Sequence, residues 1–119
     1  MKSHKDLIVW QKSMDHVAAI YVATKAFPNE ELFGIVSQMR RAAVSIPSNI
    51  AEGYGRLYDK ETVKFLSNAL GSASELETQL IISKDLGFIN RGFPEIDKPD
   101  RRNYQDVVCS HQVCKLKTC

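Results

Sequence analysis

Hydrophobic residues recur every three or four positions along most of this chain, which is the spacing of one face of an α-helix. The clearest run lies between Ser37 and Arg56, where a proline sits inside the segment without breaking the phase of the pattern. Its apolar positions are Ile35, Met39, Ala42, Ala43, Ile46 and Ile50. Because proline removes one backbone hydrogen bond at a cost of about 3 kcal/mol, we expect a helix that bends at Pro47 but does not end there.

Two further segments carry the same periodicity. The first follows a capping box made by Ser3 and Asp6, and its seam consists of Leu7, Trp10, Met14, Val17, Tyr21 and Thr24. The other segment, the third helix in chain order, follows residue 59, and its seam consists of Val63, Leu66, Leu70, Ala73, Leu76 and Leu80. In both segments additional apolar residues flank the seam, so each predicted helix needs more than one packing partner.

Turn residues separate these predicted helices. The stretch Phe27-Pro28-Asn29 ends the first, with Asn29 as the N-cap of the second and Phe33 packing back as a hydrophobic staple. The stretch from Gly53 to Arg56 ends the second, because glycine commonly takes the left-handed conformation after a helix, and Asp59 caps the third.

The pattern predicts helices at about residues 4–26, 30–54, 59–86 and 101–117, within a single domain spanning residues 1–119. The last of these has a thin apolar face. Short connections between consecutive helices favour an all-α fold, an up-down-up-down antiparallel four-helix bundle. The surplus apolar width of the first three helices predicts a partner outside the chain itself, which is typical of a homo-oligomer.

Composition narrows the function only a little. The 119 residues include 16 basic and 14 acidic side chains, so the net charge of +2 does not by itself indicate nucleic-acid binding. The chain contains no run of about 18 apolar residues and no signal-peptide core at its N-terminus. We therefore expect a cytoplasmic protein with no membrane contact.

A second, polar stripe follows the Ser37 to Arg56 helix. It consists of Arg41, Ser45, Asn49, Glu52 and Arg56, at steps of four, four, three and four. One interpretation is a solvated face, on which the Glu52 and Arg56 pair contributes about 0.3 kcal/mol. The other is a hydrogen-bonded network at a subunit contact or a ligand surface.

Basic residues gather around the predicted turn between the second and third helices. They are Arg40, Arg41, Arg56, Lys60 and Lys64, with Tyr54 and Tyr58 among them. A handful of such side chains is enough to neutralise phosphates on RNA or DNA. The alternative is a mixed-charge surface, since Glu52, Asp59 and Glu61 dilute the positive charge.

Nothing in the sequence indicates catalysis, a cofactor or a metal. The three histidines, His4, His16 and His111, lie in separate segments, and none has the Glu-x-x-His spacing of diiron bundles. The three cysteines, Cys109, Cys114 and Cys119, are five residues apart, so a helix would turn each about 140° from the last and scatter them around its axis. We expect free thiols and a protein that is not an enzyme.

Three stretches resemble a known family: WQKSM near the start, FPNEELFGIVSQMRRAAVSIPSNIAEGYGR in the middle, and FLSNALGSASELETQL after it. The family is the four-helix bundle encoded in intervening sequences of bacterial large-subunit ribosomal RNA genes, and it is similar to the accessory protein of diversity-generating retroelements. The matching positions are Trp10, Gln11, Phe27, Pro28, Glu31, Phe33, Gln38, Arg40, Arg41, Ser45, Pro47, Asn49, Glu52, Gly53, Arg56, Gly71, Glu75, Glu77, Gln79 and Leu80.

The resemblance implies a homopentamer without enzymatic activity that associates with RNA or DNA. It ends after about Gly92, where the family has a long, regular fourth helix and this chain has Pro94 and Pro99. We therefore expect a non-catalytic accessory protein that forms a homo-oligomer, the alternative being a structural scaffold for a protein partner with no nucleic-acid binding. The expected contacts with nucleic acid or a partner are Arg40, Arg56, Lys60 and Lys64. The expected structural or interface network is Arg41, Ser45, Pro47, Asn49, Glu52 and Glu75.

Overall fold

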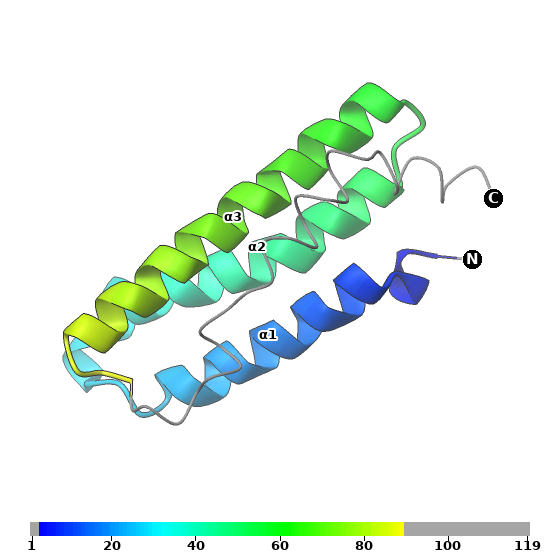
Figure 1. The fold of residues 1–119 in the computed structure, drawn as a ribbon. Helices are drawn as coiled ribbons and strands as arrows, with labels where there is room; N and C mark the ends of the chain where they lie inside the picture. Colours follow the sequence, from blue (N-terminus) through cyan, green and yellow to red (C-terminus); the bar gives the residue numbers. More distant parts are fainter. Residues whose placement is uncertain (1–2, 90–119) are drawn as a thin grey trace.

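The structure, a computed structural model, describes residues 3–89. Within them the chain forms three long helices and no strand: α1 (Ile8–Thr24), α2 (Ser37–Tyr54) and α3 (Asp59–Asp85). The chain reverses direction between α1 and α2 and again between α2 and α3, so α1 and α3 both run antiparallel to α2 (Figure 1). The all-α class is confirmed, whereas the predicted fourth helix at 101–117 and the three cysteines lie outside the described residues. No helix in the described range is long and apolar enough to cross a membrane.

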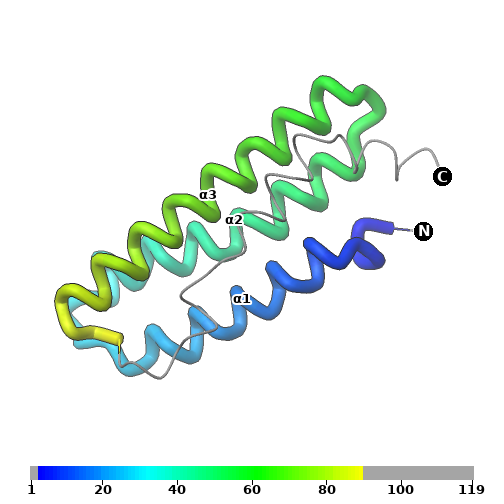
Figure 2. The backbone as a smooth tube through the Cα atoms, viewed as in Figure 1, coloured from blue at the N-terminus to red at the C-terminus, as the bar shows by residue number. Residues whose placement is uncertain are grey.

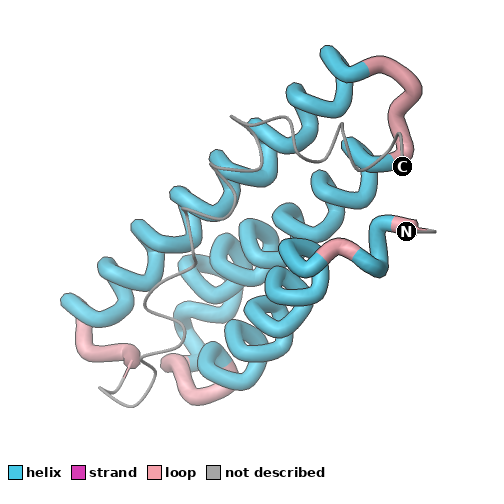
Figure 3. Tube along the Cα trace, turned by 45° about the vertical axis from the view of Figure 1, so that its right-hand side comes forward, coloured by secondary structure: helices cyan, strands magenta, loops and turns pink. Residues whose placement is uncertain are grey.

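Helix α2 supplies the centre of the core and packs against both α1 and α3, as the backbone trace shows (Figures 2 and 3). Its buried residues are Met39, Ala42, Ala43, Ile46, Pro47, Ile50 and Gly53, which confirms the predicted apolar stripe. From α3 the core receives Leu66, Ala69, Ala73, Leu76 and Leu80. Small residues on both helices allow the two backbones to approach closely.

The first helix begins later than the predicted residue 4. The capping box exists, because Ser3 Oγ accepts from the Lys5 amide (3.2 Å) and the Asp6 carboxylate accepts from the Ser3 amide (3.3 Å). It closes a short 3₁₀ turn, His4–Asp6, and not an α-helix. Leu7 then adopts an extended conformation (φ −73°, ψ 126°) and is buried, so the α-helix starts at Ile8.

The face that α1 buries also differs from the predicted seam. Leu7 and Thr24 are buried as expected, but Met14 and Tyr21 are exposed. The fully buried positions inside the helix are Ser13, Ile20, Ala23 and Thr24. Apolar residues occur on several sides of α1, so the sequence pattern did not determine which side meets α2.

The connection from α1 to α2 is not the single helix from residue 30 that the sequence predicts. A 3₁₀ turn, Asn29–Glu31, is followed by a π-helical turn, Leu32–Val36, in which Gly34 departs from helical geometry (φ −102°, ψ −117°). Asn29 is therefore not an N-cap. The predicted staple is also wrong, because Phe33 is 93% exposed.

Helix α2 continues through Pro47, as predicted, and the side chains after the proline hydrogen-bond to the backbone. Ser48 Oγ donates to the Val44 carbonyl and Asn49 Nδ2 to the Ser45 carbonyl, both at 2.8 Å. The carbonyl that loses its amide partner is that of Ala43, four residues before the proline. The two side chains thus reinforce the neighbouring turn and do not replace the missing bond.

The two helix ends that contain glycine differ in geometry. Gly55 has φ −78°, so the left-handed conformation predicted after α2 is not used there. Gly87, after α3, has φ +80° and allows two capping bonds, from the Phe88 amide to the Ser83 carbonyl (2.8 Å) and from the Gly87 amide to the Lys84 carbonyl (3.0 Å). The Phe88 ring then packs on Phe27, with centroids 5.5 Å apart. At the other end of α3 the N-cap is Tyr58 and not Asp59, which is the first helical residue.

Two glycines show where helices come close. A Cβ on Gly53 would lie 3.2 Å from both the Phe65 Cβ and the Thr62 carbonyl oxygen, because α2 and α3 are in contact there. Gly71 on α3 is exposed by contrast, and no atom of residues 3–89 lies within 4 Å of its Cβ position. The close contact of the described chain is therefore at Gly53.

Replacing each glycine by alanine tests this difference. Gly71→Ala should raise the free energy of unfolding by up to about 1 kcal/mol, the helix propensity of alanine over glycine. Gly53→Ala should lower it by about 1 kcal/mol, because overpacking between two backbones costs about 1–3 kcal/mol and exceeds that gain. Urea unfolding of both variants measures the difference, and equal stabilisation by the two substitutions would contradict the close contact.

Candidate functional site

The polar stripe of α2 links this helix to α3. The hydroxyl oxygens of Ser45 and Ser72 lie 2.8 Å apart, and Asn49 Nδ2 donates to Ser45 Oγ at 2.9 Å. All three side chains are half-buried. These bonds fix the register of α2 against α3, so Ser45 and Asn49 have a structural role inside the chain. The sequence pattern did not predict Ser72, which lies in a run of small residues, Gly71-Ser72-Ala73-Ser74.

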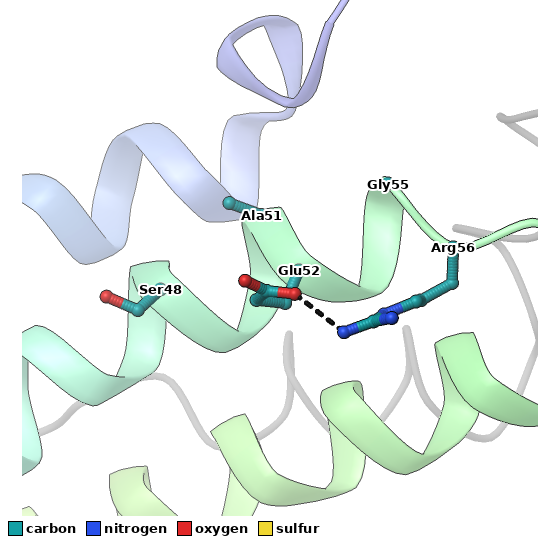
Figure 4. Close-up of a pocket in the computed structure, with 5 residues that line it drawn as sticks. All are labelled: Ser48, Ala51, Glu52, Gly55 and Arg56. Carbon is teal, nitrogen blue, oxygen red and sulfur yellow. Dashed lines mark hydrogen bonds and ion pairs between the residues drawn. The ribbon is translucent and has the colours of Figure 1, made fainter.

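The same stripe ends in an ion pair beside a shallow depression. Arg56 Nη2 donates to a Glu52 carboxylate oxygen at 2.9 Å (Figure 4). The guanidinium carbon of Arg56 lies 4.6 Å from the centroid of the Phe65 ring. The depression has a volume of about 600 Å³ and is lined by Ser48, Ala51, Glu52, Gly55 and Arg56. The exposed ion pair contributes little to stability, but together with the ring it holds Arg56 against the start of α3.

Three of the four predicted contact residues lie near the α2–α3 turn. Lys60 and Lys64 are exposed and one helical turn apart on α3, about 6 Å between their Cβ atoms. Arg56 lies against Phe65, the residue after Lys64. We call Arg56, Lys60 and Lys64 the basic end. Its apolar neighbours are exposed too, with Leu57 at 90% and Tyr58 at 69%.

The fourth predicted contact, Arg40, lies elsewhere. Arg40 lies fourteen residues before Tyr54, the last residue of α2, which is about 21 Å along the axis, and Arg56 follows beyond that end, so the structure does not bring the two arginines together. Arg40 Nε donates to Thr24 Oγ1 at 2.9 Å, and its guanidinium carbon lies 4.6 Å from the centroid of the Tyr21 ring. Arg40 is half-buried and joins α1 to α2. The sequence pattern placed Thr24 in an apolar seam and did not predict its hydrogen bond with Arg40.

Arg41 faces away from the core, in contrast to its neighbour. It is exposed, and it forms no hydrogen bond or ion pair with any residue between 3 and 89. A depression of about 510 Å³ surrounds it, lined by Tyr21, Leu32, Phe33, Val36, Ser37, Arg40, Arg41 and Val44. The exposed Leu32 and Phe33 were not predicted as part of a site, and they directly precede Gly34, which departs from helical geometry.

The remaining predicted network residues are separate from the Ser45 group. Pro47 is buried in the core. Glu75 is exposed on α3 and accepts a hydrogen bond from Gln79 Nε2 at 3.2 Å, one turn further along the same helix. The structure thus divides the predicted network into an internal group, formed by Ser45 and Asn49, and exposed charges, formed by Arg41, Glu52 and Glu75.

His4 packs against two aromatic rings near the N-terminus. The His4 ring lies 5.2 Å from the Trp10 ring and 6.4 Å from the Tyr54 ring, which places the first turn beside the end of α2. Between residues 3 and 89, no three side chains of His, Cys, Asp or Glu lie together in a way that would hold a metal ion.

Fold and surface together describe a small helical protein whose exposed charges lie along α2 and α3. The family model described as "23S rRNA-intervening sequence protein" matches residues 5–97. The chain therefore belongs to that family, as the sequence resemblance indicated, and the match covers all three described helices. A search of curated proteins finds no match to the chain.

A pair of neighbouring substitutions tests the different roles of the two arginines. Arg40→Ala removes a charged hydrogen bond and a stacking contact, so it should lower the free energy of unfolding by about 1–3 kcal/mol. Arg41→Ala, the matched control, should change it by less than about 0.5 kcal/mol in a sample dilute enough to be monomeric. Chemical denaturation measures both, and a neutral Arg40→Ala would contradict its bond to Thr24.

Proposed function

We propose that this protein is a non-catalytic, cytoplasmic homo-oligomer that binds RNA or DNA as an accessory protein. Five copies is the assembly that the family resemblance implies. The observation that carries the nucleic-acid part is the basic end, where three cations and an exposed tyrosine share one corner of the molecule. The assembly part is supported by exposed apolar side chains.

Large apolar side chains are exposed along α2 and at both of its ends. Phe33 and Leu57 are almost fully exposed, and Leu32 and Val44 are each at least 40% exposed. Large apolar side chains that are left uncovered together mark interaction sites more often than free surface. A second copy of the chain is the partner that is always present at the same concentration.

The basic end has the features of a contact for a phosphate backbone. Lys60, Lys64 and Arg56 supply the positive charge, and Tyr58 offers an aromatic face on which an unpaired base could stack. Glu52, Asp59 and Glu61 lie nearby and reduce the net charge. Such a surface supports binding that is weak, salt-dependent and indifferent to sequence.

Charge reversal of the two lysines tests the proposal. Purified protein should bind a structured RNA or a DNA duplex at low salt, and the slope of log K against log salt should lose about 0.9 for each duplex phosphate contact removed. Lys60→Glu with Lys64→Glu should therefore weaken binding and reduce the slope by about 2 on duplex DNA. Binding is followed by fluorescence anisotropy at a protein concentration at which light scattering gives the same oligomer mass for the variant and the wild type.

The control carries the same change in net charge on another helix. Lys12→Glu with Lys25→Glu reverses an exposed lysine of α1 and the exposed lysine at its C-cap, and should leave most of the binding intact. Equal losses in the two double variants would show an effect of net charge and would overturn the assignment to the basic end. Oligomeric wild-type protein that binds neither RNA nor DNA at low salt would favour the alternative, a scaffold for a protein partner.

A further inference from the structure

Exposed residues form one stripe on α2 and another on α3. We define the α2 outer stripe as Arg41, Val44, Ser48 and Glu52, and the α3 outer stripe as Lys64, Gly71, Glu75 and Ile82. The steps are three, four and four on α2, and seven, four and seven on α3, so each set lies on one side of its helix. All eight residues are exposed.

The packing of α2 on α3 sets the heights of these residues along the bundle. Ser45 and Ser72 are hydrogen-bonded and therefore lie at one level. Because the helices are antiparallel and rise 1.5 Å per residue, Arg41 and Glu75 lie about 6 and 4.5 Å from that level in the same direction. Glu52 and Lys64 lie about 10.5 and 12 Å from it in the other direction. Opposite charges thus stand at nearly equal heights on the two stripes, within about 1.5 Å.

These charges are not fully paired within residues 3–89. Among residues 3–89, Arg41 forms no ion pair, and the carboxylate of Glu75 accepts only the neutral amide of Gln79. Glu52 pairs with Arg56, but that pair is exposed and leaves the carboxylate open to a second cation. No atom of the described part of the chain lies within 4 Å of the Cβ position of Gly71. Each stripe therefore presents charges whose complement lies on the other stripe.

We propose that a second copy of the chain packs alongside the first in the parallel orientation, with the α2 outer stripe of one copy against the α3 outer stripe of the next. Arg41 then faces Glu75 of the next copy, and Glu52 faces its Lys64. Rotation about an axis parallel to the helices keeps every residue at its height, so the same two pairings recur at each contact of a cyclic assembly. This inference rests on the homo-oligomer of the proposed function and identifies its contact surface.

The apolar residues at one end of the bundle agree with the parallel orientation. The contact of Phe27 with Phe88 shows that the α1–α2 connection and the end of α3 lie at the same end of the molecule. Exposed Leu32 and Phe33 precede α2 there, and exposed Ile82 and Leu86 end α3. Parallel copies bring these four side chains together between neighbours, which buries an apolar cluster beside the Arg41 and Glu75 pair.

An antiparallel dimer would pair the charges differently. With the copies related by an axis perpendicular to the helices, Arg41 would meet Glu52 of the partner, and Lys64 would meet Glu75. It would place Phe33 and Leu86 near the basic end of the other copy. In the parallel arrangement the exposed apolar side chains of one copy lie against those of the next. The two arrangements also give opposite results when one charge of each stripe is reversed.

The experiment measures oligomer mass by light scattering as the concentration is lowered, for the wild type and for three charge variants. Arg41→Glu alone and Glu75→Arg alone each place like charges at every contact, and each should raise the concentration at which the assembly half-dissociates about tenfold. The double variant Arg41→Glu with Glu75→Arg restores opposite charges across the parallel contact. It should return to within about threefold of wild type.

A fourth variant separates folding from assembly. The side chain of Gly71→Leu meets no neighbour among residues 3–89 at the Cβ position, so the helical content and the unfolding midpoint of the dilute protein should not fall. On the α3 outer stripe the added side chain should obstruct the next copy and raise the half-dissociation concentration. Normal assembly by Gly71→Leu would exclude a close contact at this level and would overturn the proposal.

The outcomes are distinct. Failure of the double variant to recover, with both single variants impaired, would overturn the parallel pairing and indicate the antiparallel one. An oligomeric wild type with no effect of any charge variant would place the contact on another surface while leaving the proposed homo-oligomer intact. A monomeric wild type at all concentrations would remove both this inference and the assembly part of the proposed function.

Discussion

The close packing of α2 on α3 is the interaction on which the other features of the molecule depend. It requires the bare backbone of Gly53 beside Phe65, and its register is set where Ser45 meets Ser72. The same contact holds Arg56 over the Phe65 ring, and so places the basic end. It also brings Arg41 level with Glu75. The charges that we assign to assembly are thus arranged by a contact inside the core, although none of them belongs to the core.

The sequence predicted best those helices whose apolar residues lie on one side. On α2 the stripe from Met39 to Ile50 is buried as expected, and α3 spans residues 59–85 against the predicted 59–86. On α1 apolar residues lie on several sides, so the pattern left the rotation of the helix open, and Met14 and Tyr21 were placed in a seam that the structure does not use. The irregular turns before α2 depend on the unusual conformation of Gly34, which composition alone does not reveal.

The sequence predicted which residues belong to the candidate site better than it predicted how they are arranged. Arg40 and Arg41 are adjacent in sequence and about 100° apart on the helix, so one meets α1 while the other faces outward. Which of them finds Thr24 depends on the rotation of α1, the feature that the pattern did not fix. Gly53 and Gly71 present the same difficulty, because both are helical glycines. Only the packing shows that α3 occupies the space beside the Cβ position of Gly53, whereas no atom of residues 3–89 lies near that of Gly71.

The central claim is that neighbouring copies meet through α2 and α3 in parallel, and chemical cross-linking tests it most directly. A zero-length carbodiimide joins a lysine amine to a carboxylate only when the two are in contact. In an equal mixture of unlabelled and ¹⁵N-labelled wild-type protein, the account predicts a mixed-isotope cross-link between Lys64 and Glu52. A mixed-isotope link from Lys64 to Glu75, with none to Glu52, would contradict it.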